Sequence, residues 1–136
     1  MSDPDSKIAI ERLLDAFSGG DFEGVEDVLA PGFVNHGLPP VPGATGDRAG
    51  VLAAMRYLRT ALPDARAEPV SIVPEGDRVG VHDRLVGTHR GDFRGVAPTG
   101  REIRVDFIHV FRVADGRIVE RWGVADTTAL MQQLGA

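Results

Sequence analysis

The segment spanning residues 101–126 limits the possible folds more than any other part of the chain. It contains two stretches in which apolar residues recur at alternate positions, and Asp115-Gly116 lies between them. An Asp-Gly pair in that position is typical of the tight turn of a β-hairpin. We therefore expect two antiparallel strands here, with the residue pairs Val113 and Ile118, Phe111 and Glu120, and His109 and Trp122.

Side chains alternate between the two faces of a strand, so one face of this hairpin is expected to combine aromatic rings with two polar groups. The residues on that face would be Phe107, His109, Phe111, Ile118, Glu120 and Trp122. A face of this kind is either a core that holds an imidazole and a carboxylate, or the wall of a ligand cavity. We interpret it as a cavity wall.

Length and composition indicate an ordinary globular protein. A chain of 136 residues is long enough to bury a sizeable core, and we expect residues 1–136 to form a single domain. The net charge is −5 and the basic residues are scattered, so the sequence does not indicate nucleic-acid binding. The absence of cysteine excludes disulfides, thiolate metal sites and a cysteine nucleophile. No apolar run approaches membrane-span length, and we expect a cytoplasmic protein without membrane association.

The first half of the chain predicts helices. Apolar residues follow helical spacing after Asp3-Pro4, after Asp21 and after Asp47, and in each case a capping side chain precedes them. Gly19-Gly20 ends the first of these helices, Pro31-Gly32 the second and Pro63-Asp64 the third. A short extended piece at residues 33–36 and a proline-rich loop at 37–43 separate the second helix from the third.

The second half predicts strands at residues 67–73 and 78–88, a loop at 89–100, the hairpin, and a short last helix capped by Asp126 or Thr127. Helices followed by strands indicate an α+β fold. Three N-terminal helices would pack on the concave side of a curved, largely antiparallel sheet. Such an arrangement encloses a concave and mostly apolar site.

Several short motifs, taken in order, resemble those of the SnoaL-like polyketide cyclases, a branch of the NTF2-like α+β cone superfamily. They are Phe33-Val34-Asn35-His36, Leu62-Pro63-Asp64, Glu75-Gly76-Asp77-Arg78-Val79, Gly87-Thr88-His89-Arg90-Gly91, Pro98-Thr99-Gly100-Arg101, and the hairpin with Trp122, Asp126 and Gln133-Leu134-Gly135. The resemblance implies the cone fold with a mixed sheet, a homodimer, and an aldol-type ring closure that uses no metal or cofactor. It also implies an acid/base carboxylate near Asp126. The family usually has Arg at the position of His82 and a small residue at that of Arg84.

Three residues are candidates for acid/base catalysis. A carboxylate that abstracts a proton from carbon needs a raised pKa, which an apolar setting provides. Asp126 is either that carboxylate or the N-cap of the last helix. His109 either donates a hydrogen bond to an enolate or acts as the base, unless it is a structural histidine paired with Glu120. Glu120 orients His109, or it is a solvated acid if our register is wrong by one residue.

Six further residues are candidates for substrate contact. Phe107, Phe111 and Trp122 would stack on the rings of a ligand. His82 and Arg84 share a strand face, which is either the concave face, where they would bind ligand oxygens, or the solvent face. His36 lies at the cavity rim or is merely solvated. The sequence contains no HExxH motif and no carboxylate cluster with metal-ligand spacing, so we expect neither a metal nor a cofactor.

These residues favour a cofactor-independent acid/base enzyme that acts on a small apolar carbonyl compound. A different functional class is the alternative, namely a non-catalytic module that binds a small ligand or dimerises, because a fold does not determine a function. A further alternative on the same cone is an isomerase or an epoxide hydrolase with an Asp-Arg-Asp arrangement, to which Arg84 and Asp126 would contribute. The second acid of that arrangement is uncertain, because Asp83 should point to the face opposite Arg84.

Overall fold

The computed structural model describes residues 2–38 and 41–135. Its elements follow the predicted order of two helices, a strand, a helix, four strands and a last helix. They are α1 (Asp3–Ser18), α2 (Phe22–Val28), β1 (Leu29–Asn35), α3 (Arg48–Ala61), β2 (Arg66–Glu75), β3 (Arg78–Thr88), β4 (Glu102–Ala114), β5 (Arg117–Ala125) and α4 (Thr127–Gln133). Within these described residues, no helix is long and apolar enough to cross a membrane.

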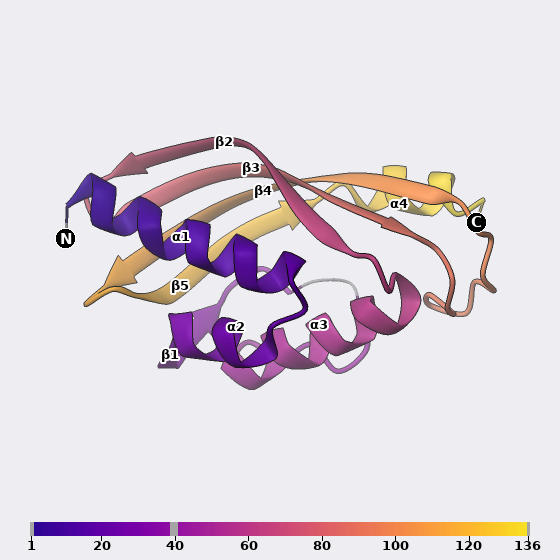
Figure 1. Ribbon diagram of the computed structural model, residues 1–136, viewed down its shortest axis with the longest axis horizontal. Coiled ribbons are helices and arrows are strands. Elements are labelled where there is room, and N and C mark those ends of the chain that lie inside the picture. Colours follow the sequence, from indigo (N-terminus) through magenta and orange to yellow (C-terminus); the bar gives the residue numbers. More distant parts are fainter. Residues whose placement is uncertain (1, 39–40, 136) are drawn as a thin grey trace.

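The five strands form one curved sheet in the order β1-β5-β4-β3-β2. β1 runs parallel to β5 and the other neighbours are antiparallel, so the sheet is mixed. Helices α1, α2 and α3 lie against its concave side (Figure 1). The predicted α+β cone, with three N-terminal helices on the concave face and a short C-terminal helix, is confirmed.

Side-chain caps begin α2, α3 and α4 where the sequence predicted them, whereas α1 is capped by Ser2 and not by Asp3. The carboxylates of Asp21, Asp47 and Asp126 accept hydrogen bonds from backbone N–H groups three residues later, at 2.9 Å, 2.9 Å and 3.0 Å. The end of α2 differs from the prediction, because the helix stops at Val28 and Pro31-Gly32 lies within β1. A proline is compatible with β1, since β1 is an edge strand of the sheet.

The pairing of β4 with β5 contains a β-bulge that the hairpin pattern did not reveal. Val113 pairs with Ile118 as predicted, but the next pair is Arg112 with Glu120, which leaves Val119 as an extra residue. Phe111 is therefore opposite Arg121 and not Glu120, and His109 is opposite Gly123 and not Trp122. The predicted register was wrong beyond Ile118. As a result, the concave face of β5 carries Arg121 in place of Glu120 and Trp122.

Two buried apolar clusters lie on the concave side of the sheet. One joins α1, α2 and β1 to the inner face of β3, β4 and β5, and includes the fully buried Ile10, Val79 and Ile118. The other joins the end of α3 to α4 and the opposite end of β4, and includes Ile103 and Leu134. Both clusters contribute residues to the cavity described next.

Candidate functional site

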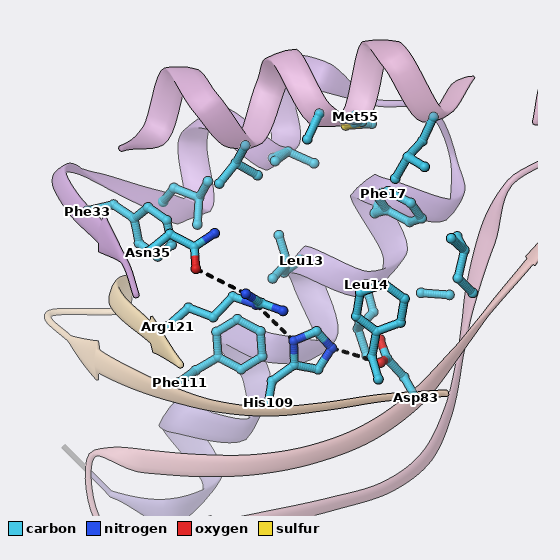
Figure 2. Close-up of a pocket in the computed structure, with 18 residues that line it drawn as sticks. Leu13, Leu14, Phe17, Phe33, Asn35, Met55, Asp83, His109, Phe111 and Arg121 are labelled. Atoms are coloured by element: carbon cyan, nitrogen blue, oxygen red, sulfur yellow. Dashed lines mark hydrogen bonds and ion pairs between the residues drawn. The ribbon is translucent and has the colours of Figure 1, made fainter. Parts of the chain in front are cut away.

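A cavity of about 160 Å³ lies between the concave face of the sheet and the helices α1 and α3 (Figure 2). Fourteen of its 18 lining residues are apolar. The four polar ones are Asn35, Asp83, His109 and Arg121. The apolar surroundings make these four side chains the chemically distinctive part of the site.

The four polar side chains come from four neighbouring strands and are joined by hydrogen bonds (Figure 2). Arg121 Nε donates to His109 Nδ1 at 2.9 Å, and Arg121 Nη1 donates to Asn35 Oδ1 at 3.0 Å. His109 Nε2 lies 2.8 Å from Asp83 Oδ1. The side chains of His109 and Asp83 are only 10% and 7% exposed. A continuous polar row therefore crosses the cavity floor.

The guanidinium of Arg121 determines the tautomer of His109. Arg121 Nε–H is always a donor, so Nδ1 of the imidazole must be the acceptor. The proton of the neutral ring is then on Nε2, which donates it to the Asp83 carboxylate. Burial is the largest cause of the lowered pKa of His109, and the charge of Arg121 lowers it further. The hydrogen bond to Asp83 raises the pKa and so opposes these two effects. Hence His109 is a neutral donor to Asp83 at neutral pH.

Arg121 itself remains a cation in this setting. Burial lowers the pKa of Arg121 to about 10, while the charge of Asp83 raises it. The site thus contains a buried cation and the Asp83 carboxyl, with a neutral imidazole between them.

Three polar atoms of this row have no hydrogen-bond partner among the residues that the structure describes. They are Asp83 Oδ2, Arg121 Nη2 and Asn35 Nδ2. These three atoms are not fully buried. The fully buried side-chain atoms without a partner are Arg59 Nε and His89 Nε2, among the residues that the structure describes. One acceptor and two donors of the row are therefore available to a ligand in an apolar cavity.

The absence of a side chain at Gly123 makes room for Arg121. A Cβ atom at position 123 would lie 2.5 Å from Arg121 Nη2 and 2.7 Å from Cζ. The guanidinium therefore lies over the backbone of Gly123, beside His109 on the neighbouring strand.

Of the candidate residues, His109, Phe107 and Phe111 line the cavity. The three rings stack along β4, with centroid distances from His109 of 5.5 Å to Phe107 and 5.1 Å to Phe111. The predicted face of β4 is therefore correct.

Glu120 and Trp122 lie outside the cavity, contrary to the prediction for this face of β5. His36, which follows β1, is exposed and also lies outside the cavity lining, in agreement with the solvated alternative. His36 Nε2 is 2.8 Å from Glu120 Oε2, and the imidazole stacks on Trp122 with a centroid distance of 4.9 Å. Arg112 also pairs with Glu120 at 2.7 Å. The hydrogen bond from His36, and then that from Arg112, lower the pKa of Glu120. The bulge at Val119 is the cause, because it turns Glu120 and Trp122 to the outer face of the sheet.

His82 and Arg84 also occupy the outer face, where both contact Asp106 Oδ1, at 2.8 Å and 3.0 Å. The solvent-face interpretation of these two residues agrees with the structure, and the ligand-contact interpretation does not. Asp126 is exposed, does not line the cavity, and accepts a hydrogen bond from Ala129 N as the N-cap of α4. Its position is that of the helix cap and not of a cavity carboxylate.

The sequence analysis missed Asp83, Arg121 and Asn35. Asp83 was recognisable, because it alternates with Val81 and Leu85 on the apolar face of its strand. Arg121 could not be recognised, since a regular alternation places it on the outer face. Within the described part of the chain, no three His, Asp or Glu side chains gather as a metal site would require.

Comparison with known proteins agrees with the fold and the order of motifs. The profile of the SnoaL-like polyketide cyclases matches residues 7–134. The chain belongs to this family. It is 29% identical over 127 residues to the aklanonic acid methyl ester cyclase AcmA of Streptomyces galilaeus, covering 93% of this chain and 88% of AcmA.

Two further members of the SnoaL-like family support this assignment. The nogalonic acid methyl ester cyclase of Streptomyces nogalater is 29% identical over 128 residues, which cover 90% of this chain and 92% of that enzyme. The crystal structure of wild-type IdmH from Streptomyces antibioticus superimposes with a TM-score of 0.83 at 35% identity, covering 96% of this chain and 99% of IdmH. AcmA and the enzyme from Streptomyces nogalater, two relatives of this SnoaL-like protein, are thus both named as cyclases.

The lowered pKa of His109 predicts a pH dependence of stability. The unfolded chain binds a proton on this residue near its ordinary pKa of 6.5, whereas the folded protein resists protonation. The free energy of unfolding should therefore be highest above pH 6.5 and fall below it, by at most about 1.4 kcal/mol per pH unit. Urea unfolding at pH 7.5, 6.5 and 5.5 measures this slope. His109→Gln should reduce the slope of the unfolding free energy against pH, and His82→Gln on the outer face should not. Equal slopes in the unmodified protein and in both variants would contradict the prediction.

The packing of Gly123 predicts that Gly123→Ala displaces Arg121. The new methyl group overlaps the guanidinium, so Arg121 moves away from His109 Nδ1 and its charge no longer lowers the pKa of the imidazole. The pKa of His109, measured by NMR titration of the ring protons, should rise. Gly80→Ala is the matched control, since its Cβ would meet no atom closer than Val73 O at 3.8 Å. An unchanged pKa in the Gly123 variant would show that Arg121 is not held there.

Proposed function

We propose that this protein is a cofactor-independent acid/base enzyme that closes a ring in a small apolar carbonyl compound by aldol chemistry. The observation that carries the proposal is the cavity of a cyclase-family protein in which Asp83 Oδ2, Arg121 Nη2 and Asn35 Nδ2 are all available. A carboxylate in the same cavity as two donors suits a reaction in which a proton leaves carbon and negative charge develops on oxygen.

In the proposed reaction, Asp83 removes a proton from a carbon between two carbonyl groups. The electron pair of the broken C–H bond moves to the carbonyl oxygen, and the resulting enolate oxygen accepts hydrogen bonds from Arg121 and Asn35. The enolate carbon then attacks a second carbonyl carbon of the same molecule and forms the new C–C bond. The oxygen of that carbonyl takes the proton back from Asp83, so the enzyme returns to its starting state.

His109 is a positioning residue in this proposal. Its Nε2–H donates to Asp83 Oδ1, which leaves Oδ2 as the oxygen that faces the ligand. Phe107 and Phe111, which flank His109 along β4, would contact the carbon skeleton. The acid/base role therefore moves from the predicted Asp126 to Asp83, and Glu120 has no part in it.

Epoxide hydrolysis by an Asp-Arg-Asp arrangement is less well supported. Arg121 shares the cavity with one acid, Asp83, from which His109 separates it, and its other side-chain neighbour is the neutral Asn35. Arg84 and Asp126, which were expected to contribute, are both outside the cavity lining.

Proton abstraction can be tested before the natural substrate is known. Ethyl 2-oxocyclohexanecarboxylate in D₂O exchanges the proton on the carbon between its two carbonyl groups, and ¹H NMR follows the loss of its signal. The protein should accelerate this exchange above the buffer rate. Asp83→Asn should reduce the acceleration by roughly a hundredfold or more while the ketoester still binds.

Two carboxylate variants serve as controls for that experiment. Asp106→Asn on the outer face and Asp126→Asn at the cap of α4 should both retain the exchange activity. Full activity of Asp83→Asn would remove Asp83 from the mechanism, and loss of activity in Asp126→Asn would return the acid/base role to Asp126. Binding of the ketoester by the unmodified protein without any exchange would favour a non-catalytic binding module.

The outer face of the sheet supports a second part of the proposal, that the protein is a homodimer. Four apolar side chains are gathered there with large exposed fractions, namely Val73 (62%), Ile108 (51%), Val110 (37%) and Val124 (69%). Charged pairs flank them on both sides: Arg84 with Asp106, and Arg112 with Glu120. A face with both charge signs at its margins is complementary to itself, which suits a twofold interface with a second copy.

Ile108→Asp should convert such a dimer into a monomer, because it places a charge in the middle of the apolar area. Sedimentation velocity at micromolar concentration measures the change. Ile8→Asp is the matched control, since Ile8 is equally exposed at 52% but lies on α1, and this variant should remain dimeric. A monomeric unmodified protein, or a dimeric Ile108 variant, would contradict the proposed interface.

A further inference from the structure

The distribution of polar groups around the cavity restricts the kind of ligand that it accepts. We propose that the ligand carries its oxygen atoms along one side only and that the part entering the cavity is about the size of a single ring. This describes a reduced, largely hydrocarbon carbonyl compound, and not a ring system with hydroxyl or keto groups around its edge. The inference rests on the proposed function only in assuming that the ligand contains a carbonyl group.

The polar groups of the cavity form a single diagonal row on the sheet. Asn35 on β1 is directly opposite Arg121 on β5. Arg121 reaches diagonally to His109, whose direct partner is Gly123, and His109 reaches diagonally to Asp83, whose direct partner is Phe107. Every available hydrogen-bonding atom identified in the cavity thus belongs to one wall.

The facing wall consists of apolar side chains from α1 and α3. Its lining residues are Leu13, Leu14, Phe17, Val51, Ala54, Met55 and Leu58. The backbone N–H and C=O groups within these helices bond to one another, so they have little capacity left for a ligand. A hydroxyl or keto group against this wall would lose its hydrogen bonds to water without replacement, which weakens binding roughly ten- to a hundredfold for each such group.

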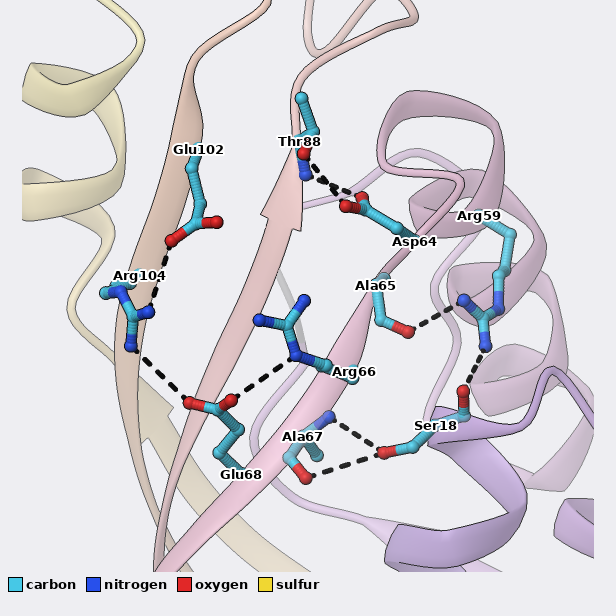
Figure 3. A network of polar contacts seen from close by, with 10 residues as sticks. All are labelled: Ser18, Arg59, Asp64, Ala65, Arg66, Ala67, Glu68, Thr88, Glu102 and Arg104. Atoms are coloured by element: carbon cyan, nitrogen blue, oxygen red, sulfur yellow. Dashed lines mark hydrogen bonds and ion pairs between the residues drawn. The ribbon is translucent and has the colours of Figure 1, made fainter.

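Polar side chains of α1 and α3 bond to the neighbouring strand and loop. Arg59 Nε is buried without a partner among the described residues, but Arg59 does not line the cavity. Arg59 of α3 donates to Ser18 O at 3.0 Å and to Ala65 O at 2.7 Å, and Ser18 Oγ accepts from Ala67 N at 3.0 Å (Figure 3). Tyr57 Oη accepts a hydrogen bond from Arg94 N at 2.7 Å. These side chains connect the helices to the neighbouring strand and loop, so they supply no hydrogen bond to the apolar wall.

The size of the cavity gives the second restriction. A volume of about 160 Å³ is close to that of a cavity that holds a benzene-sized molecule, which is about 150 Å³. One substituted ring fits this space, whereas two fused rings exceed this volume.

Two isomeric probes test the position of the oxygens. In 2,3-dihydroxyacetophenone the oxygens are carried by three adjacent ring positions, whereas in 3,5-dihydroxyacetophenone they are spread around the ring and cannot all lie along one side. The dissociation constants, measured by ligand-observed NMR titration, should favour the 2,3-isomer by at least roughly tenfold. The two-ring compound 1-hydroxy-2-acetonaphthone, which tests the size, should bind more weakly than its single-ring counterpart 2-hydroxyacetophenone.

A variant of the apolar wall separates the effect of the cavity from the different solubilities of the isomers. Val51→Thr replaces a methyl group with a hydroxyl at nearly constant volume, and it should narrow the ratio between the isomers by improving the binding of 3,5-dihydroxyacetophenone. Val70→Thr on β2, a 49% exposed residue outside the cavity, should leave the ratio unchanged.

Several results would overturn the inference: equal binding of the two isomers, binding of neither, tighter binding of the two-ring compound, or an unchanged ratio in Val51→Thr. The outcome is independent of catalysis, because these aromatic probes report binding alone. Discrimination between the isomers without exchange of the ketoester would leave the inference standing and refute the proposed reaction. Exchange of the ketoester without discrimination between the isomers would refute the inference and leave the proposed reaction standing.

Discussion

The burial of the Arg121 guanidinium is the constraint on which the site depends. A cation in an apolar cavity needs partners that replace its water, and here they are His109, Asn35, the backbone carbonyl of Gly37 and, through the imidazole, Asp83. The lowered pKa of Arg121, about 10, reflects the burial that these partners offset. Removing one member of the row takes a hydrogen-bond partner from its neighbour, so the four residues are best regarded as one unit.

A single extra residue in β5 makes this arrangement possible. Without the bulge at Val119, regular alternation would place Glu120 and Trp122 in the cavity and Arg121 on the outer face. The bulge supplies the cavity with a cation, and Gly123 leaves the space that the cation occupies. The same shift places Trp122 on the outer face beside His36, so one local irregularity determines both faces of the strand.

Membership of the SnoaL-like family agrees with this design without determining its details. His82 and Arg84, the two residues that we expect to depart from the family pattern, both bind Asp106 on the outer face. That departure therefore changes the surface of the sheet and leaves the cavity floor as it is. The features specific to the cavity are instead its polar row on one wall and its hydrocarbon wall on the other.

The sequence by itself determined the order of the elements, the helix caps, the α+β cone and the inward position of His109, because spacing, turns and caps depend on residues close together in the chain. Only the tertiary structure decided which residues accompany His109. A one-residue bulge reverses the facing of every later side chain in β5, and apolar alternation does not reveal it. The hydrogen bonds of the site also join distant residues, up to 86 positions apart for Arg121 and Asn35, so no local pattern could identify them.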